Sequence, residues 1–164
     1  MIVTVIATGF GLDANGVATP SSNEFNNAVI YFPSYAMING NAVEVKTVQG
    51  FKAKSIKGIY IPDTVTRIAG GGGAGCFGDI SVLKNVVVGK GVTTIEQETF
   101  CMGNGATLDE FIFKGTITRI ETYAFKDLKQ ASGDIPYEFN TVLTYVGSYV
   151  SVANNRGGNV LREV

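Results

Sequence analysis

The segment RIAGGGGAGCF, at positions 67–77, has the first spacing in the chain that could bind a ligand. Gly70, Gly72 and Gly75 satisfy a G-x-G-x-x-G pattern, which in nucleotide-binding proteins lets the backbone approach a phosphate. A phosphate loop would continue with Lys and Ser or Thr, whereas Cys76 and Phe77 follow here. A dinucleotide fingerprint would open a long helix, and another short repeat follows instead. The glycines are therefore interpreted as a flexible insertion between strands.

The two cysteines do not form a catalytic or metal-binding set. The chain contains no histidine, so the commonest general base and the commonest metal ligand are both missing. Cys76 and Cys101 lack the C-x-x-C spacing of a zinc pair. They are interpreted as buried thiols, with a disulfide between neighbouring repeats as the alternative under oxidising conditions. No cofactor and no metal are expected.

Two carboxylate pairs, Glu96/Glu98 and Asp109/Glu110, have the residue types of a glycoside hydrolase. Such an enzyme needs its two carboxyl groups on either side of a cleft, and nothing in the pattern indicates one. The pairs are interpreted as solvated turns, and the protein is predicted not to be an enzyme. An enzyme acting on glycans, with a cleft lined by Glu96, Glu98 or Glu110, is the most distant alternative.

Composition indicates one apolar domain. The chain has 164 residues, of which 45% are hydrophobic and 16% are charged, and its net charge is −1. A nearly neutral chain has no electrostatic footprint for nucleic acid, and no apolar run approaches the roughly 20 residues of a spanning helix. The opening MIVTVIATGF lacks the basic region and cleavage site of a secretory signal. We expect either a complete protein made without export or a piece of a larger exported one.

A repeat of about two dozen residues organises most of the chain. VTRI at 65–68 recurs as VTTI at 92–95, ITRI at 117–120 and, more loosely, LTYV at 143–146. Each copy follows a strand-like segment at a matching offset, and an aromatic residue comes after the first three, as Phe77, Phe100 and Phe125. Short units of this kind cannot cover their own apolar face, and stacking them forms one continuous core.

Side-chain alternation predicts which residues line that core. Because strand residues point to alternate faces, four pairs are expected inside: Ile59/Ile61, Val86/Val88, Phe111/Phe113 and Tyr137/Phe139. In the V-T-x-I step both apolar residues are expected inside as well, so the chain must bend between them. A threonine stands at each bend, where its hydroxyl is expected to bond nearby backbone groups: Thr66, Thr93, Thr118 and Thr144. Short helical or 3₁₀ turns are predicted around EQETF and ETYAF.

These units resemble the BspA-like branch of the leucine-rich repeats. The segments IYIPDTVTRI, VVVGKGVTTIEQETF and FIFKGTITRIETYAF match a unit of the form x-I-x-I-P-x-x-V-T-x-I-G-x-x-A-F. The match departs at the glycine insertion, at Gly89 and Lys114 where Pro is usual, and in the fourth copy. The resemblance implies a mainly β leucine-rich-repeat solenoid of about four rungs, and proteins exposed on microbial surfaces and used in adhesion.

The first fifty residues do not repeat cleanly. AMINGNAVEV, at 36–45, predicts a β-hairpin turned by Asn39-Gly40, and Asn15-Gly16 suggests another. VIYFP at 29–33 echoes GIYIP at 58–62, so a degenerate first rung is possible. The predicted organisation is a β-rich cap or attachment segment over residues 1–50 and the solenoid over 51–164.

Two outward rows are the candidate binding residues. Tyr60, Val87 and Ile112 should form one row, continued by Glu138, and Arg67, Thr94, Arg119 and Tyr145 should form a second. The alternative is an ordinary sheet surface packed beneath the other limb of the coil. Tyr and Arg are enriched at interface hot spots, so we select six candidates: Tyr60, Arg67, Val87, Ile112, Arg119 and Tyr145.

The function that fits these features is structural recognition. A small, histidine-free, glycine-rich β protein suits a virion component, such as a bacteriophage fibre, tail or capsid-decorating protein, and we favour that interpretation. The alternative is a fragment of a microbial cell-surface adhesin that binds host protein or glycan. The expected partners are other virion or surface proteins, and a homo-oligomer is expected, with no nucleic acid or membrane partner.

Overall fold

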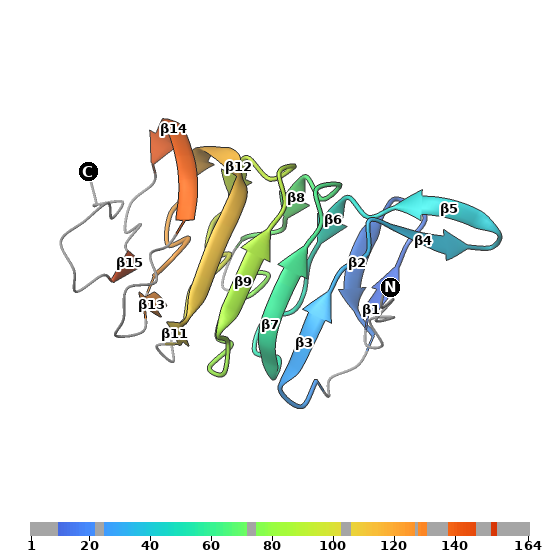
Figure 1. The fold of residues 1–164 in the computed structure, drawn as a ribbon, viewed down its shortest axis with the longest axis horizontal. Coiled ribbons are helices and arrows are strands. Elements are labelled where there is room, and N and C mark those ends of the chain that lie inside the picture. The colour runs from blue at the N-terminus through green and yellow to red at the C-terminus, as the bar shows by residue number, and fades with distance from the viewer. Residues whose placement is uncertain are drawn as a thin grey trace.

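The computed structural model describes residues 10–21, 25–71, 75–102, 106–126, 128–130, 138–146 and 152–153. These residues form a coil of strands whose successive turns lie side by side (Figure 1). This architecture confirms the predicted β-solenoid of about four turns. Tyr137 lies outside the described residues, and for Phe139, Glu138 and Tyr145 only the backbone is described.

The largest sheet is parallel and gathers strands from successive turns of the coil. Its members are β3 (Ala28–Tyr31), β7 (Ile56–Ile61), β9 (Asn85–Val88), β12 (Glu110–Ile120), β14 (Glu138–Val146) and the short β10 (Thr94–Ile95). β12 pairs with β9 through its first half and with β10 through its last residues. The long strand therefore follows the coil around the predicted bend.

Besides the main sheet, the described residues form three smaller sheets. One has four strands: β1 (Phe10–Leu12), β2 (Val17–Pro20), β6 (Thr47–Val48) and β8 (Arg67–Ile68). Another has three: β11 (Thr107–Leu108), β13 (Leu128–Gln130) and β15 (Val152–Ala153). The last is a hairpin of β4 (Tyr35–Ile38) and β5 (Asn41–Glu44), which projects beyond the end of the coil (Figure 1).

The predicted inward residues are stacked in the core. Ile59 aligns with Val86 on the next strand, and Val86 aligns with Phe111. Ile61, Val88 and Phe113 form the neighbouring row, and all six side chains are at most 5% exposed. Each rung therefore covers the apolar face of the one before it, which isolated repeats cannot do.

The V-T-x-I step bends as predicted, although its threonines bond differently. Val65 and Ile68 are both buried, as are the corresponding residues of the next two copies. The hydroxyl of Thr118 donates to the carbonyl oxygen of Thr93, and that of Thr144 donates to the carbonyl oxygen of Thr118. The hydroxyls thus link successive rungs, whereas the sequence interpretation had them bonding locally.

A row of stacked phenylalanines fills the opposite side of the core. Phe77, Phe100 and Phe125 stack with ring centroids about 6 Å apart, and Phe51 extends the row by one rung. Of the short helical or 3₁₀ turns predicted beside them, the structure has isolated i→i+3 turns, and the described residues there form no helix. Glu98 and Tyr123 have positive φ angles, which interrupt any right-handed helix.

The glycine insertion is tightly packed at its two ends. A side chain at Gly70 would collide with the backbone of Gln97, and one at Gly75 would collide with the carbonyl of Glu98. The flexible insertion predicted from the sequence does not describe these two glycines. They allow the backbone of one rung to lie directly against the next.

The N-terminal hairpins and the degenerate rung are confirmed. Asn39 and Gly40 both have positive φ between β4 and β5, as a type I′ turn requires. β1 and β2 form the second hairpin, whose turn is held by the carboxylate of Asp13. β3 pairs in parallel with β7 and supplies the buried Ile30 to the core, so it forms a rung of the main sheet.

Candidate interaction surface

The first predicted outward row is continuous in the structure. Tyr60 aligns with Val87, and Val87 aligns with Ile112. All three side chains are half-buried, between fully buried neighbours along each strand. Tyr31 on β3 aligns with Tyr60 and extends the row, although the sequence interpretation did not include it. The echo of IYIP in IYFP was the signal that could have identified it.

Tyr31 and Tyr60 form the aromatic end of this row. Their rings are stacked, with centroids 4.5 Å apart and an angle of 10° between the planes. Tyr31 is 46% exposed, because β3 is the last strand of its sheet. Burial raises the pKa of Tyr60, and the nearby Glu110 and Tyr31 raise it further. A tyrosine phenol, with an ordinary pKa of 10.0, is already protonated at neutral pH, and the raised pKa leaves it a hydrogen-bond donor.

A parallel outward row begins beside the tyrosines. Val29 aligns with Gly58, and Gly58 aligns with Asn85. A Cβ on Gly58 would lie 3.1 Å from a methyl group of Val29, so the glycine leaves room for this valine to lie over β7. Glu110 aligns with Asn85 and ends the row with a carboxylate. The face thus changes from apolar near β3 to acidic near β12.

The second predicted row is divided between two sheets. Arg119 aligns with Thr94 on one side and Tyr145 on the other. Arg67 instead aligns with Thr47, because β8 belongs to the sheet of β6. The four residues of the predicted row therefore do not form one ladder. The side chain of Tyr145 is not among the described ones.

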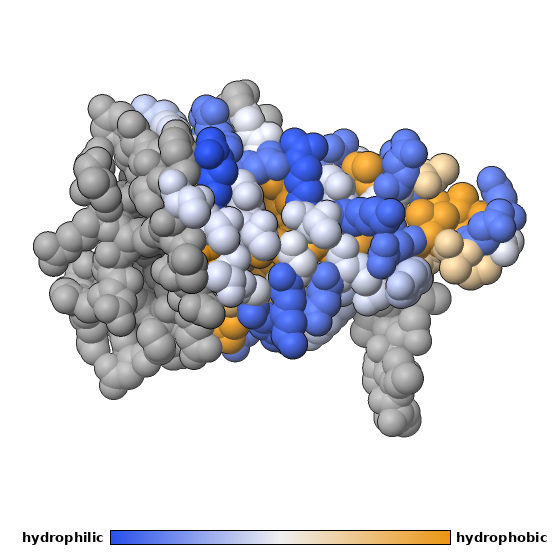
Figure 2. Space-filling view, turned by 90° about the horizontal axis from the view of Figure 1, so that it is seen from above, coloured by the Kyte–Doolittle hydropathy of each residue, from blue (hydrophilic) through white to orange (hydrophobic). Residues whose placement is uncertain are grey.

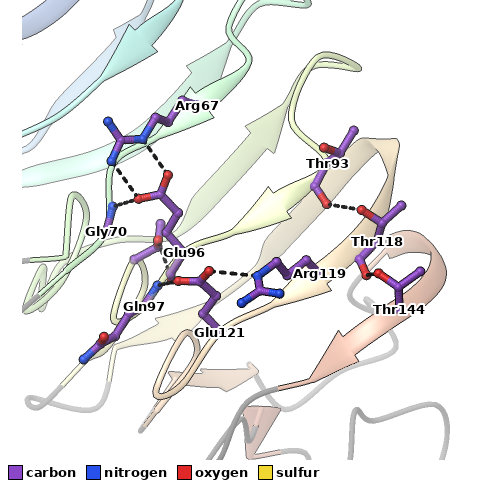
Figure 3. A network of polar contacts seen from close by, with 10 residues as sticks. Arg67, Gly70, Thr93, Glu96, Gln97, Thr118, Arg119, Glu121 and Thr144 are labelled. Carbon is purple, nitrogen blue, oxygen red and sulfur yellow. Dashed lines mark hydrogen bonds and ion pairs between the residues drawn. The ribbon is translucent and has the colours of Figure 1, made fainter.

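Both arginines of this row are held by carboxylates (Figure 3). Arg67 donates from Nε to Oε1 of Glu96 over 2.6 Å and from Nη2 to Oε2 over 3.1 Å. The backbone N–H of Gly70 donates to the same Oε2 over 2.8 Å. Arg119 donates to Oε1 of Glu121, whose other oxygen accepts from the N–H of Gln97. The same carboxylate-to-backbone contact thus recurs one rung later.

The electrostatics of Glu96 follow from these contacts. Partial burial alone would raise the pKa of its carboxyl, but hydrogen bonds from Arg67 and Gly70 outweigh burial and lower it. The same hydrogen bond with Glu96 raises the pKa of Arg67. The first glycine of the G-x-G-x-x-G pattern therefore binds an anion, namely a carboxylate of the chain itself. Sequence reasoning treated Glu96 as a solvated turn and missed this role.

The remaining candidates for chemistry are not gathered into a site. Cys76 is fully buried, Cys101 is half-buried, and neither forms a disulfide in the structure. Among the described residues, no group of three or more Cys, Asp or Glu side chains could hold a metal ion. In the same part of the chain, no helix is long and apolar enough to cross a membrane.

Comparison with known proteins identifies the repeat. The family model described as the BspA type leucine rich repeat region matches residues 44–152 in 6 copies. The chain belongs to the BspA type leucine-rich repeat family. No curated protein and no solved structure matches it. The matched region begins at Glu44, at the end of the β4–β5 hairpin.

Membership of the BspA type family sets the functional class. Leucine-rich repeats of this type suggest a surface or recognition protein, and the family is generally a non-enzymatic protein-interaction repeat. Its members are typically displayed at surfaces.

Proposed function

We propose that this BspA type repeat protein is a non-enzymatic recognition protein that binds a partner protein through the outward row of its main sheet. The observation that carries the proposal is the row Tyr31, Tyr60, Val87 and Ile112, which keeps one register across four strands. Aromatic residues at a surface poor in charge are the compositional mark of an interface core. The proposed anchors are Tyr60, Val87 and Ile112.

Arg67 and Arg119 play a supporting role in this proposal. Each guanidinium is already oriented by a carboxylate, Glu96 or Glu121, so little side-chain entropy remains to be lost on binding. A guanidinium held in this way is already oriented for contact with a partner. Tyr145 aligns with Arg119 in the backbone register and is proposed as the last residue of this second contact.

For the location of this surface, we propose the exterior of a bacteriophage particle, with other virion proteins as partners. The composition supports this assignment, because a histidine-free chain of low charge and 21 glycines is suited to a structural component. A microbial cell-surface adhesin that binds host protein or glycan is the competing assignment. Mass spectrometry of purified phage particles and of washed cell envelopes distinguishes the two directly.

The binding row is tested with labelled protein on purified phage particles, on washed cell envelopes and on immobilised glycans. Ile112→Lys replaces the last apolar anchor of the row with a charge and should weaken binding at least tenfold. Ser81→Lys adds the same charge at an exposed position on a turn and should leave binding unchanged. Equal binding by the two variants would remove the outward row from the proposal.

A further inference from the structure

The β4–β5 hairpin is an insertion at one corner of a rung. Tyr31 aligns with Tyr60 before the hairpin, and Thr47 aligns with Arg67 after it. Phe32-Pro33 therefore corresponds to Ile61-Pro62 of the next rung, and Val45 corresponds to Val65. Residues 34–44 thus replace the short Asp63-Thr64 corner. Two hydrogen bonds hold the base of the hairpin together: the carbonyl oxygen of Ser34 accepts from the N–H of Val45 and from the hydroxyl of Thr64. The rung itself does not require the hairpin.

The strand before the hairpin and all of the hairpin except Glu44 carry no charged residue. Residues 25–43 contain no Asp, Glu, Lys or Arg. The large hydrophobic side chains that are exposed in the described structure all lie here: Val29, Tyr31, Tyr35 and Met37. Figure 2 shows hydrophobic residues gathered on the projecting hairpin, whereas hydrophilic residues cover much of the neighbouring surface. Such a patch marks an interaction site in a soluble protein.

Both outer edges of this two-stranded sheet are open in the described structure. Ile38 and Asn41 flank the turn and form its hydrogen-bonded pair, so in the antiparallel alternation Ala36 and Val43 form the next one. The backbone groups of Tyr35 and Met37 consequently point away from β5. Edge strands usually carry charge or proline against further pairing, and β4 carries neither. A lone hairpin is also only marginally stable in water.

We propose that the hairpin is a self-association arm, in which β4 pairs antiparallel with β4 of a second copy of this chain. The two-fold axis passes through Ala36, so Ala36 lies opposite Ala36 of the other copy and Tyr35 lies opposite Met37. In each Tyr35–Met37 pair, the backbone N–H of either residue donates to the backbone carbonyl oxygen of the other. A two-fold axis makes the contact self-complementary. Charge repulsion does not oppose a second copy as the partner. The only carboxylate of the hairpin, Glu44, already contacts the hydroxyl of Tyr35 and the ammonium of Lys46 in its own chain. The inference goes beyond the proposed binding function and does not depend on it.

The mass of the full chain in solution tests the arm. Light scattering after size exclusion should show a dimer that dissociates on dilution. Met37→Lys, at a position already 68% exposed, should weaken association at least tenfold without lowering the thermal unfolding temperature. Ser81→Lys should dimerise as the unmodified chain does. A monomer at every concentration, or equal dimerisation of both lysine variants, overturns the proposal.

Three further variants test the proposal independently if Met37→Lys misfolds. Replacing Ser34–Glu44 with the Asp-Thr corner of the next rung should give a folded monomer. Ala36→Cys should form a disulfide-linked dimer on mild oxidation. In the proposed pairing, Ala36 and its copy form a non-hydrogen-bonded pair, and the Cα atoms of such a pair are about 4.5 Å apart. Ala42→Cys on β5 should not cross-link. Cross-linking of Ala42→Cys alone, or a stable dimer without the arm, would contradict pairing through β4.

Discussion

Arg67 and Glu96 join two rungs whose strands belong to different sheets. β8, which carries Arg67, pairs with β6, whereas β10, just before Glu96, pairs with β12. The glycine insertion lies between them, and the bidentate contact of guanidinium and carboxylate spans the junction at 2.6 and 3.1 Å. The N–H of Gly70 binds the same carboxylate. A side-chain contact thus joins two successive rungs at a point where their short strands, β8 and β10, do not pair with each other.

This junction should make stability depend on pH. The folded pKa of Glu96 is lowered, so its contribution is complete above the ordinary value of 4.5 and is lost as pH falls through the folded pKa. Glu96→Gln should lower the free energy of unfolding by about 1 kcal/mol at pH 7, because the pair is partly exposed to solvent. The difference from the unmodified chain should shrink below pH 4.5. Urea unfolding at several pH values measures it.

A double-mutant cycle with Arg67→Gln isolates the contact. If the two residues act together, Glu96→Gln should cost less in the Arg67→Gln background than in the unmodified chain. The remaining cost reports the bond to the N–H of Gly70. Fully additive losses would show that the two side chains stabilise the coil independently.

The phenylalanine row should dominate the stability of the core. Phe100 is fully buried between Phe77 and Phe125 and also contacts Phe111 edge-on. Phe100→Ala should therefore lower the free energy of unfolding by about 3–5 kcal/mol. Tyr35→Ala, which removes an exposed ring, serves as the control and should cost much less. Similar losses for both would mean that the row is loosely packed.

The repeat predicts much of this fold because it has two independent periodicities: the alternation of side chains along a strand and the spacing between successive V-T-x-I segments. Alternation along a strand assigns Ile59 to the core and Tyr60 to the surface, and the spacing of V-T-x-I assigns each residue its neighbour one rung later. Together they determine the rows through Val87 and Ile112 from the amino-acid sequence alone. The Asn39-Gly40 turn is equally readable, since few residue pairs adopt positive φ twice.

The errors arose where contacts between rungs override local preference. Glu98 adopts positive φ where EQETF favours a helical turn, and its rung neighbour Gly75 packs directly against it. The role of Glu96 depends on Arg67, which is 29 residues away. The split of the second row depends on which sheet β8 joins. None of these features has a signal within a single repeat.

The thiol of Cys76 should be unreactive in the folded protein. Its side chain is fully buried, and burial raises its pKa, so the thiolate is disfavoured. In a Cys101→Ser background, iodoacetamide should modify Cys76 only after urea unfolding, as mass spectrometry will show. Because the unfolded thiol ionises first, stability should also fall as pH rises above the ordinary value of 9.0. Rapid modification under native conditions would place the thiol at the surface.

The glycines at the ends of the insertion should tolerate no side chain. A methyl group at Gly75 would collide with the carbonyl oxygen of Glu98, and both partners are backbone. Gly75→Ala should therefore cost about 3 kcal/mol, since neighbouring rungs must move apart. Gly11→Ala is the matched control, because a methyl group there meets no atom within 4 Å. Urea unfolding of the two variants compares the sites, and equal stability would show that the insertion is slack after all.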